Sequence, residues 1–170
     1  LPVLDTLKKQ DKIIVSVDTY HSETALAALE RGAHIINDVF GLQYDPVIAE
    51  ITASYGAGIV IMHTNRNRTP LADPIDDQKA FFTTSLKLAQ KAGIKEANIV
   101  LDPGFGFGKD AALNIKLFQR IGELKALGFP LLAGTSRKRF LGHLSQYSTP
   151  TELDIATAAS SALLRQQGFA

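Results

Sequence analysis

The chain has 170 residues, of which 45% are hydrophobic, and its formal net charge at pH 7 is +1. This balance predicts one domain with a real core, and it points to neither nucleic acid nor a membrane surface as a partner. Cys is absent, which excludes disulfide bonds and thiolate metal sites. No apolar run has the length of a membrane span and no basic leader opens the chain, so we expect a cytoplasmic protein.

The pattern of apolar residues predicts short strands that alternate with helices. The predicted strands cover residues 13–17, 35–36, 59–62, 99–101 and 131–134. The predicted helices cover residues 1–10, 23–31, 47–55, 77–92, 110–127, 138–142 and 151–167. The expected N-caps are Ser22, Asp45 and Thr151, and Thr151 opens a capping box that Asp154 closes.

Polar residues follow every predicted strand, and this bears on the architecture. Parallel strands with helices between them fit either an open, doubly wound sheet or part of a (β/α)8 barrel. The chain begins inside a predicted helix and ends where a next strand is expected, and its first βα turn lacks the glycine pattern of a dinucleotide site. These details favour a partial TIM barrel of the α/β class, forming a single domain over residues 1–170.

Two stretches carry the chemistry. In the first, the apolar run 99–101 ends on Asp102 and continues into a glycine-rich loop, and in the second, residues 131–139, a similar run leads into Ser136 and three cations. We expect both stretches to face one pocket together with Asp18 and Asn37. A buried carboxylate accepts two N–H donors side by side, which suits a flat, nitrogen-rich heterocycle, and an amide both donates and accepts. The alternative is that Asp102 organises its own turn and Asp18 its own loop.

The residues that surround these acids leave several alternatives open. Phe105 and Phe107 either pack against a flat ligand or anchor the loop to the core. The glycine loop lacks the four-residue gap of a P-loop, which excludes that phosphate site. Arg137, Lys138 and Arg139 at the start of a helical turn need a nearby anion, unless they form a solvated surface. His63, at the end of a strand, fits a hydrogen-bonded structural histidine as well as a ligand contact.

Five motifs together carry a family resemblance. They are V-S-V-D-T (15–19), G-A-H-I-I-N-D-V (32–39), I-M-H (61–63), L-D-P-G-F-G-F-G-K (101–109) and G-T-S-R-K-R-F-L-G (134–142). In order and position the chain resembles the dihydropteroate synthases, which are pterin-binding (β/α)8 barrels. By this resemblance the chain holds strands three to seven of eight. The opening N-V-T-P-D-S-F-S-D-G-G loop, the G-G-E-S-T-R-P-G loop and the terminal R-V-H-D strand of the family are absent from it.

The resemblance implies a transferase of folate biosynthesis that joins p-aminobenzoate to 6-hydroxymethyl-7,8-dihydropterin pyrophosphate. It implies Mg²⁺ as cofactor, with its ligand on an N-terminal segment outside this sequence, as well as a homodimer and a target of sulfonamides. Lys138 resembles the lysine that touches the pterin and balances the leaving pyrophosphate, and Ser136 lies near the p-aminobenzoate carboxylate. We expect these 170 residues to be inactive alone. The predicted substrate-binding residues are Asp18, Asn37, Met62, Asp102, Phe107, Gly134, Ser136, Arg137 and Lys138, with Asp102 and Lys138 also catalytic and no metal ligand among them.

Two other functions remain compatible with the sequence. One is the pterin domain of a corrinoid-dependent methyltransferase, which shares the acid and the asparagine but lacks the S-R-K turn. The other is a non-catalytic, pterin-binding remnant, which the absent strands suggest.

Overall fold

The computed structural model describes residues 2–7, 12–146 and 148–170. The chain divides into two compact units. Unit 1 comprises residues 1–62 and 81–101, and unit 2 comprises residues 63–80 and 102–170. Leu1 and residues 8–10 of the first predicted helix lie outside the described residues.

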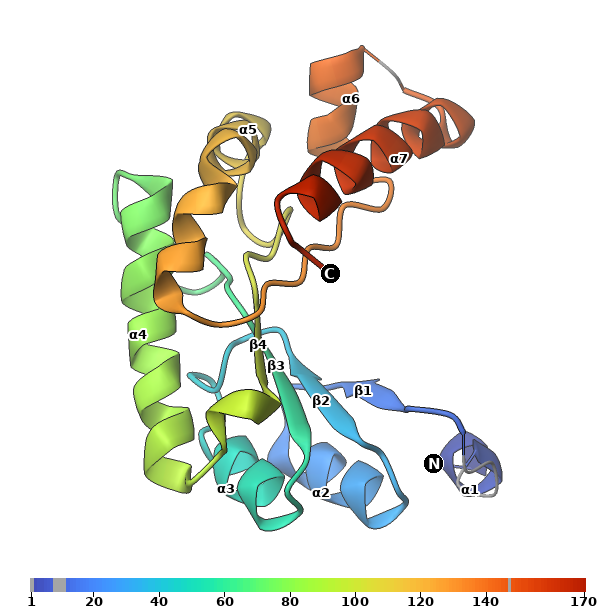
Figure 1. The fold of residues 1–170 in the computed structure, drawn as a ribbon, viewed down its shortest axis with the longest axis vertical. Coiled ribbons are helices and arrows are strands. Elements are labelled where there is room, and N and C mark those ends of the chain that lie inside the picture. The colour runs from blue at the N-terminus through green and yellow to red at the C-terminus, as the bar shows by residue number, and fades with distance from the viewer. Residues whose placement is uncertain (1, 8–11, 147) are drawn as a thin grey trace. The chain divides into compact units, whose positions relative to one another are not determined.

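Unit 1 contains a four-stranded sheet in the order β1-β2-β3-β4 (Figure 1). The strands are β1 (Ser16–Asp18), β2 (Ile35–Asp38), β3 (Gly58–Met62) and β4 (Ile99–Asp102). The helices of this part are α1 (Pro2–Leu7), α2 (Ser22–Glu30) and α3 (Val47–Ser54), and α4 (Pro74–Ala92) runs along the chain from unit 2 into unit 1. Strands β1, β2 and β3 pair in parallel, and the register places Asp18 opposite Asn37.

Unit 2 contains three α-helices after β4 and one 3₁₀ helix. These are α5 (Ala111–Arg120), the 3₁₀ helix Ile121–Leu127, α6 (Arg139–Ser145) and α7 (Pro150–Gln166). Helix α6 packs against both α5 and α7.

Each unit has its own apolar core. Strands β3 and β4 are mostly apolar and buried, as expected for inner strands of a parallel sheet, whereas β1 is short and largely exposed. The core of unit 1 includes Ile36, Ile48, Ile59, Ile61, Phe82 and Leu101, and that of unit 2 includes Phe105, Leu117, Ile121, Leu131, Phe140 and Phe169.

The predicted α/β class is confirmed, and the strands predicted over residues 35–36, 59–62 and 99–101 correspond to β2, β3 and β4. The strand predicted over residues 13–17 is shorter and lies later, at Ser16–Asp18, and the fifth predicted strand, 131–134, is wrong. In the described part of the chain, the backbone of this segment pairs with one residue: Ala170 N donates to Leu131 O and Ala133 N donates to Ala170 O. A single partner residue cannot form a ladder. The segment therefore does not join the four-stranded sheet.

Helix boundaries differ from the predictions where side chains cap at other positions. Thr149, rather than Thr151, is the N-cap of α7: it forms a capping box with Glu152, and Pro150 takes the first helical position. Helix α4 begins before residue 77 because the Asp73 carboxylate accepts the N–H groups of Ile75 and Asp76.

Two further predicted N-caps are also displaced. Helix α2 has His21 at its N-cap, without a side-chain cap, and α3 has Pro46 there. Asp45 instead links the two helices, because one of its oxygens accepts from Val47 N and the other from Ser22 N.

The long helix predicted over residues 110–127 is divided at Ile121. The predicted apolar spacing survives the change, because Ile121 and Leu124 are three residues apart and both are buried. Residues at this spacing share one face of a 3₁₀ helix. Gly122, a poor α-helix former, lies at the division.

Candidate functional site

In unit 1, Asp18 and Asn37 end neighbouring strands and contact each other. Asn37 Nδ2 donates to Asp18 Oδ2 over 3.4 Å. Asn37 Oδ1 is buried and accepts no hydrogen bond from the described residues. A buried carbonyl oxygen without a donor is costly, and a ligand N–H removes that cost. The predicted acid–amide pair is therefore assembled, with one acceptor still available.

Asp38, the next residue, is the buried acid of this part of the sheet. Its carboxylate accepts from Phe40 N over 2.8 Å and from Leu42 N over 2.7 Å. Burial raises the pKa of Asp38, while these two hydrogen bonds oppose the rise. Asp38 thus shapes the turn after β2, whereas Asp18 is exposed.

In unit 2, Asp102 is buried, and only one of its oxygens accepts a hydrogen bond. Oδ1 accepts from Gly104 N over 2.7 Å, so the turn-forming role weighed from the sequence is correct for this oxygen. Among the described residues, no donor is recorded for Oδ2. Burial raises the pKa of Asp102 to about 6, against the hydrogen bond from Gly104 and the positive charges of Lys109 and Lys138. A second carboxylate oxygen is left for a ligand.

Two roles were predicted for the aromatic residues of the glycine-rich loop, to anchor the loop to the core or to pack against a ligand, and each residue fits one of them. Phe105 is buried and stacks on Phe140, with ring centroids 5.2 Å apart and an interplanar angle of 24°. Phe107 is only half-buried, and its ring lies between two cations: Arg66 Cζ is 4.9 Å and Lys138 Nζ is 4.6 Å from its centroid. Phe105 therefore anchors the loop, and Phe107 is the aromatic that can meet a ligand.

His63 belongs to a buried network that orders the loop after β3. Its Nε2 lies 2.9 Å from Asp77 Oδ2, and Arg68 donates to both oxygens of Asp77 over 2.8 and 2.6 Å. Leu71 N also donates to Asp77 Oδ1. Burial lowers the pKa of His63 to about 4, against the hydrogen bond to Asp77. These contacts support the structural role weighed for His63.

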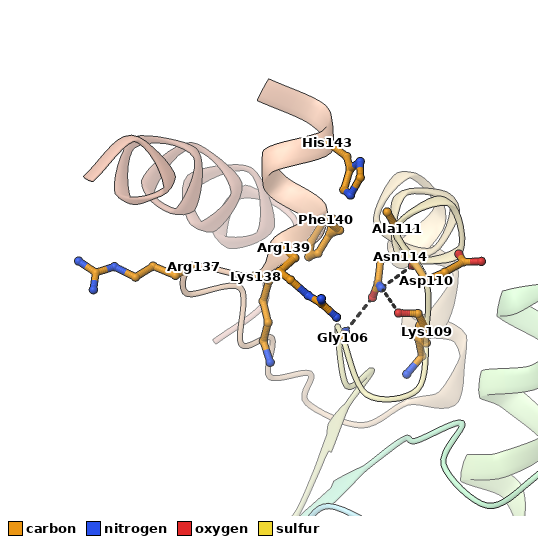
Figure 2. Close-up of a pocket in the computed structure, with 10 residues that line it drawn as sticks. All are labelled: Gly106, Lys109, Asp110, Ala111, Asn114, Arg137, Lys138, Arg139, Phe140 and His143. Atoms are coloured by element: carbon orange, nitrogen blue, oxygen red, sulfur yellow. Dashed lines mark hydrogen bonds between the residues drawn. The ribbon is translucent and has the colours of Figure 1, made fainter. Parts of the chain in front are cut away.

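The three consecutive cations have different partners. Arg137 binds the Asp154 carboxylate through two hydrogen bonds of 2.7 and 2.8 Å, and in Figure 2 its side chain extends away from the other lining residues. Lys138 is half-buried beside Phe107, and burial lowers its pKa. Arg139 and His143 extend from α6 toward the start of α5 (Figure 2). They line a cavity of about 430 Å³ that Lys109 and Lys138 also line.

Three other residues were predicted to contact the ligand: Met62, Gly134 and Ser136. Met62 is 3% exposed and belongs to the core of unit 1, so the core role weighed for it is supported. Gly134 and Ser136 are exposed in the segment between Leu131 and α6.

Sequence reasoning missed three residues that hold the glycine-rich loop. Lys109 Nζ donates to Gly104 O over 2.8 Å. Asn65 N donates to Phe107 O, and Asn114 Oδ1 accepts from Gly106 N over 2.8 Å. Lys109 has a sequence signal, because it directly follows three alternating glycines. Asn114 had none, because an asparagine within an amphipathic helix gives no pattern.

No group of three His, Asp or Glu residues within residues 2–7, 12–146 and 148–170 could hold a metal ion. The Mg²⁺ ligand that the resemblance implies is expected on a segment outside this sequence, so no reaction step is assigned to a metal here. No helix in the same ranges is long and apolar enough to span a bilayer.

The sequence profile described as "Pterin binding enzyme" matches residues 1–170. The chain belongs to the pterin-binding enzyme family. This confirms the resemblance drawn from the five motifs, whose acids, amide and lysine lie at the positions described above.

Relatives within this family share the fold over part of their length. A curated dihydropteroate synthase of Bacillus subtilis is 38% identical over 168 residues, which is 99% of this chain and 58% of that protein. The dihydropteroate synthase of Clostridium difficile, solved in the presence of pteroic acid, matches with a TM-score of 0.92 and 39% identity over 99% of this chain and 64% of that one. The Xanthomonas albilineans enzyme with 4-aminobenzoic acid matches with a TM-score of 0.90 and 34% identity, over 99% and 61% of the two chains.

The chain thus spans about three fifths of the length of the relatives it matches. Because these structures contain barrels of the dihydropteroate synthase type, the fold is part of a (β/α)8 barrel, and the open doubly wound sheet is excluded.

Proposed function

We propose that this chain is the central part of a dihydropteroate synthase. The full-length protein condenses p-aminobenzoate with 6-hydroxymethyl-7,8-dihydropterin pyrophosphate, giving dihydropteroate and pyrophosphate. The observation that carries the proposal is the buried Asp102 carboxylate, whose Oδ1 is used by the turn and whose Oδ2 has no recorded donor among the described residues. A reduced pterin presents N–H donors along its aminopyrimidine edge, and a charge-assisted hydrogen bond to a carboxylate is strong.

Asn37 and Asp18 supply further acceptors for the same class of ligand. The buried Oδ1 of Asn37 has no donor among the described residues and is matched by a ring N–H. The relatives solved with pteroic acid and 4-aminobenzoic acid support ligands of this chemistry for the family. Asn37 and Asp18 are therefore assigned to pterin binding, as Asp102 is. The substrate roles of Met62, Gly134, Ser136 and Arg137 stay predictions.

The reaction assigned to the full-length protein needs no protein nucleophile. The C–O bond to pyrophosphate breaks, and the pterin ring nitrogens stabilise the positive charge left on the exocyclic methylene. The neutral arylamine then forms the C–N bond and loses a proton. Lys138 offers a cation to the departing pyrophosphate, since preorganised charge stabilises a transition state in which charge develops. Its half-buried position beside Phe107 suits both the pterin and the leaving group.

The magnesium ligand on another segment, the homodimer, the cytoplasmic location and sensitivity to sulfonamides remain predictions for the full-length protein. If these predictions hold, Mg²⁺ supplies further positive charge to the leaving pyrophosphate.

Calorimetry with the pterin pyrophosphate, followed by a pyrophosphate-release assay with p-aminobenzoate, tests the function. We expect binding and release of one pyrophosphate per dihydropteroate formed. Binding of methyltetrahydrofolate without pyrophosphate release identifies the methyltransferase alternative. Pterin binding by the full-length protein with no product identifies the non-catalytic alternative.

A further inference from the structure

Lys109 carries a positive charge inside unit 2 that the proposed reaction does not use. Its Nζ donates to Gly104 O over 2.8 Å and lies 3.4 Å from His63 O and 3.5 Å from Phe107 O. Three backbone carbonyls thus surround the ammonium group. Two of them belong to the loop after β4, and the third belongs to His63, the first residue after β3. A buried ammonium is costly unless it is hydrogen-bonded in this way.

These carbonyls belong to the segments that present the candidate ligand-binding groups. Gly104 is the residue whose N–H binds Asp102 Oδ1, and Phe107 carries the ring between Arg66 and Lys138. The Phe107 carbonyl also accepts from Asn65 N over 3.1 Å. The ammonium group therefore fixes both ends of the loop that runs from the acid to the aromatic ring.

The same loop is held on another side by an uncharged residue. Asn114 Oδ1 accepts from Gly106 N over 2.8 Å, and Asn114 Nδ2 donates to Lys109 O over 3.0 Å and to Asp110 O over 2.7 Å (Figure 2). Asn114 is also buried. The half-buried Lys109 and the buried Asn114 thus fix the same loop, and of these two residues Lys109 alone brings a charge.

We propose that Lys109 is a positioning residue whose ammonium group fixes the loop from Asp102 to Phe107 and holds Asp102 in its ionised, pterin-binding state. This inference rests on the proposed function. It deepens that function by assigning to a residue without substrate contact the control of the acid that binds the pterin.

The positive charges of Lys109 and Lys138 favour the ionised state of Asp102. Lys109 and Lys138 both lower the pKa of Asp102, which burial raises to about 6. Burial lowers the pKa of Lys109 to about 7, against the charges of Asp102 and Asp77. Arg68 and Lys138 add to that lowering, and buried His63 contributes its carbonyl. Removing the charge of Lys109 therefore leaves Asp102 with a higher pKa and a smaller ionised fraction near neutral pH.

The test compares the full-length wild type and four variants by calorimetry with 6-hydroxymethyl-7,8-dihydropterin pyrophosphate, without p-aminobenzoate, from pH 5 to 8. Lys109→Gln keeps a donor for the carbonyls but removes the charge, and Lys109→Arg keeps the charge. Asn114→Ala loosens the same loop without altering its charge. Circular dichroism at each pH confirms folding, and Lys109→Met is a second uncharged variant.

For the wild type we expect affinity to fall as the pH drops through about 6. Lys109→Gln is expected to raise that midpoint by about one pH unit, which weakens binding about twofold at pH 7 and nearly tenfold, at about one pH unit per tenfold, at pH 5. Lys109→Arg and Asn114→Ala are expected to keep the wild-type midpoint. An unchanged midpoint in both uncharged variants overturns the inference, as does an equal shift in Asn114→Ala. A wild type that binds no pterin at any pH overturns the proposed function itself.

Discussion

Lys138 Nζ lies 4.6 Å from the centroid of the Phe107 ring, so a half-buried cation is held over the face of the aromatic side chain most able to meet a ligand. Cation–π contacts of this kind contribute roughly 0.5–2 kcal/mol. The contact also keeps the lysine from turning away to solvent. It joins the glycine-rich loop to the start of α6, the two stretches singled out from the sequence.

Lys138→Met in the full-length protein is expected to lower the rate of dihydropteroate formation by about tenfold or more, because the leaving pyrophosphate loses a preorganised cation. Steady-state kinetics measure this effect. Lys116→Met is the matched control, since Lys116 is an exposed lysine of α5 without an assigned role. Equal losses in the two variants contradict the role given to Lys138.

Asp102→Asn is expected to stabilise the protein above pH 6. The folded pKa of Asp102, about 6, exceeds its ordinary value of 3.8, so the folded protein favours the neutral acid. The stability that the neutral acid contributes is complete below pH 3.8 and is lost progressively as the pH rises through 6. Asparagine keeps the acceptor for Gly104 N and removes the charge. At about 1.4 kcal/mol per pKa unit, the gain reaches on the order of 3 kcal/mol at pH 7. Denaturant unfolding at pH 4 and pH 7 measures it, and a gain that does not grow with pH contradicts this account.

The His63–Asp77 network predicts loss of stability in acid. The folded pKa of His63, about 4, is below its ordinary 6.5, so the stability of the neutral ring is complete above pH 6.5 and is lost as the pH falls to 4. Burial acts to raise the pKa of Asp77, but hydrogen bonds from His63, Arg68 and Leu71 hold it below its usual range, which extends the loss to lower pH.

The free energy of unfolding of the wild type should therefore decrease between pH 6.5 and 4, by on the order of 3 kcal/mol from His63 alone. His63→Asn, which cannot titrate, should show a shallower decrease over the same window. Parallel pH profiles of the two proteins, measured by urea unfolding, are the result that this account does not allow.

Gly108 is a position where the backbone itself limits substitution. Its φ is +68°, and a β-carbon there would lie 2.8 Å from Arg66 N. Gly128 has a similar φ of +81°, but its β-carbon would meet nothing within 4 Å. Both alanine variants are strained, and Gly108→Ala is expected to be less stable than Gly128→Ala by about 1–3 kcal/mol because the loop must also shift. Thermal unfolding that ranks the two variants equally contradicts the close approach.

The sequence was informative wherever one local pattern determines the structure. Apolar runs located β2, β3 and β4, and the residues just after them supplied Asn37 and Asp102. Predictions from the sequence were wrong where the local structure depends on a partner far along the chain. The run 131–134 has strand composition, but its pairing is with Ala170, and the cap of α2 depends on Asp45, 23 residues along the chain. Lys109 stands in a recognisable glycine-rich motif, but its partners are carbonyls of two separate segments, which only the fold brings together.

The pairing of Arg137 with Asp154 illustrates the same limit. Three consecutive cations predicted an anion nearby, and one anion is supplied by the chain itself. The partner is a carboxylate of the first turns of α7, 17 residues away, which the sequence suggested as a capping residue. Only the fold shows that Arg137 is already neutralised, while Lys138 stays beside Phe107.

The most direct test of pterin binding is the affinity of Asp102→Asn for 6-hydroxymethyl-7,8-dihydropterin pyrophosphate, measured by calorimetry in the full-length protein at pH 8. The dissociation constant is expected to rise more than about tenfold, since a charge-assisted pair is lost, while the variant remains folded and gains stability. Asp73→Asn, at an exposed acid that caps α4, is expected to bind like the wild type. An unchanged dissociation constant for Asp102→Asn would contradict the assignment of this carboxylate to the pterin.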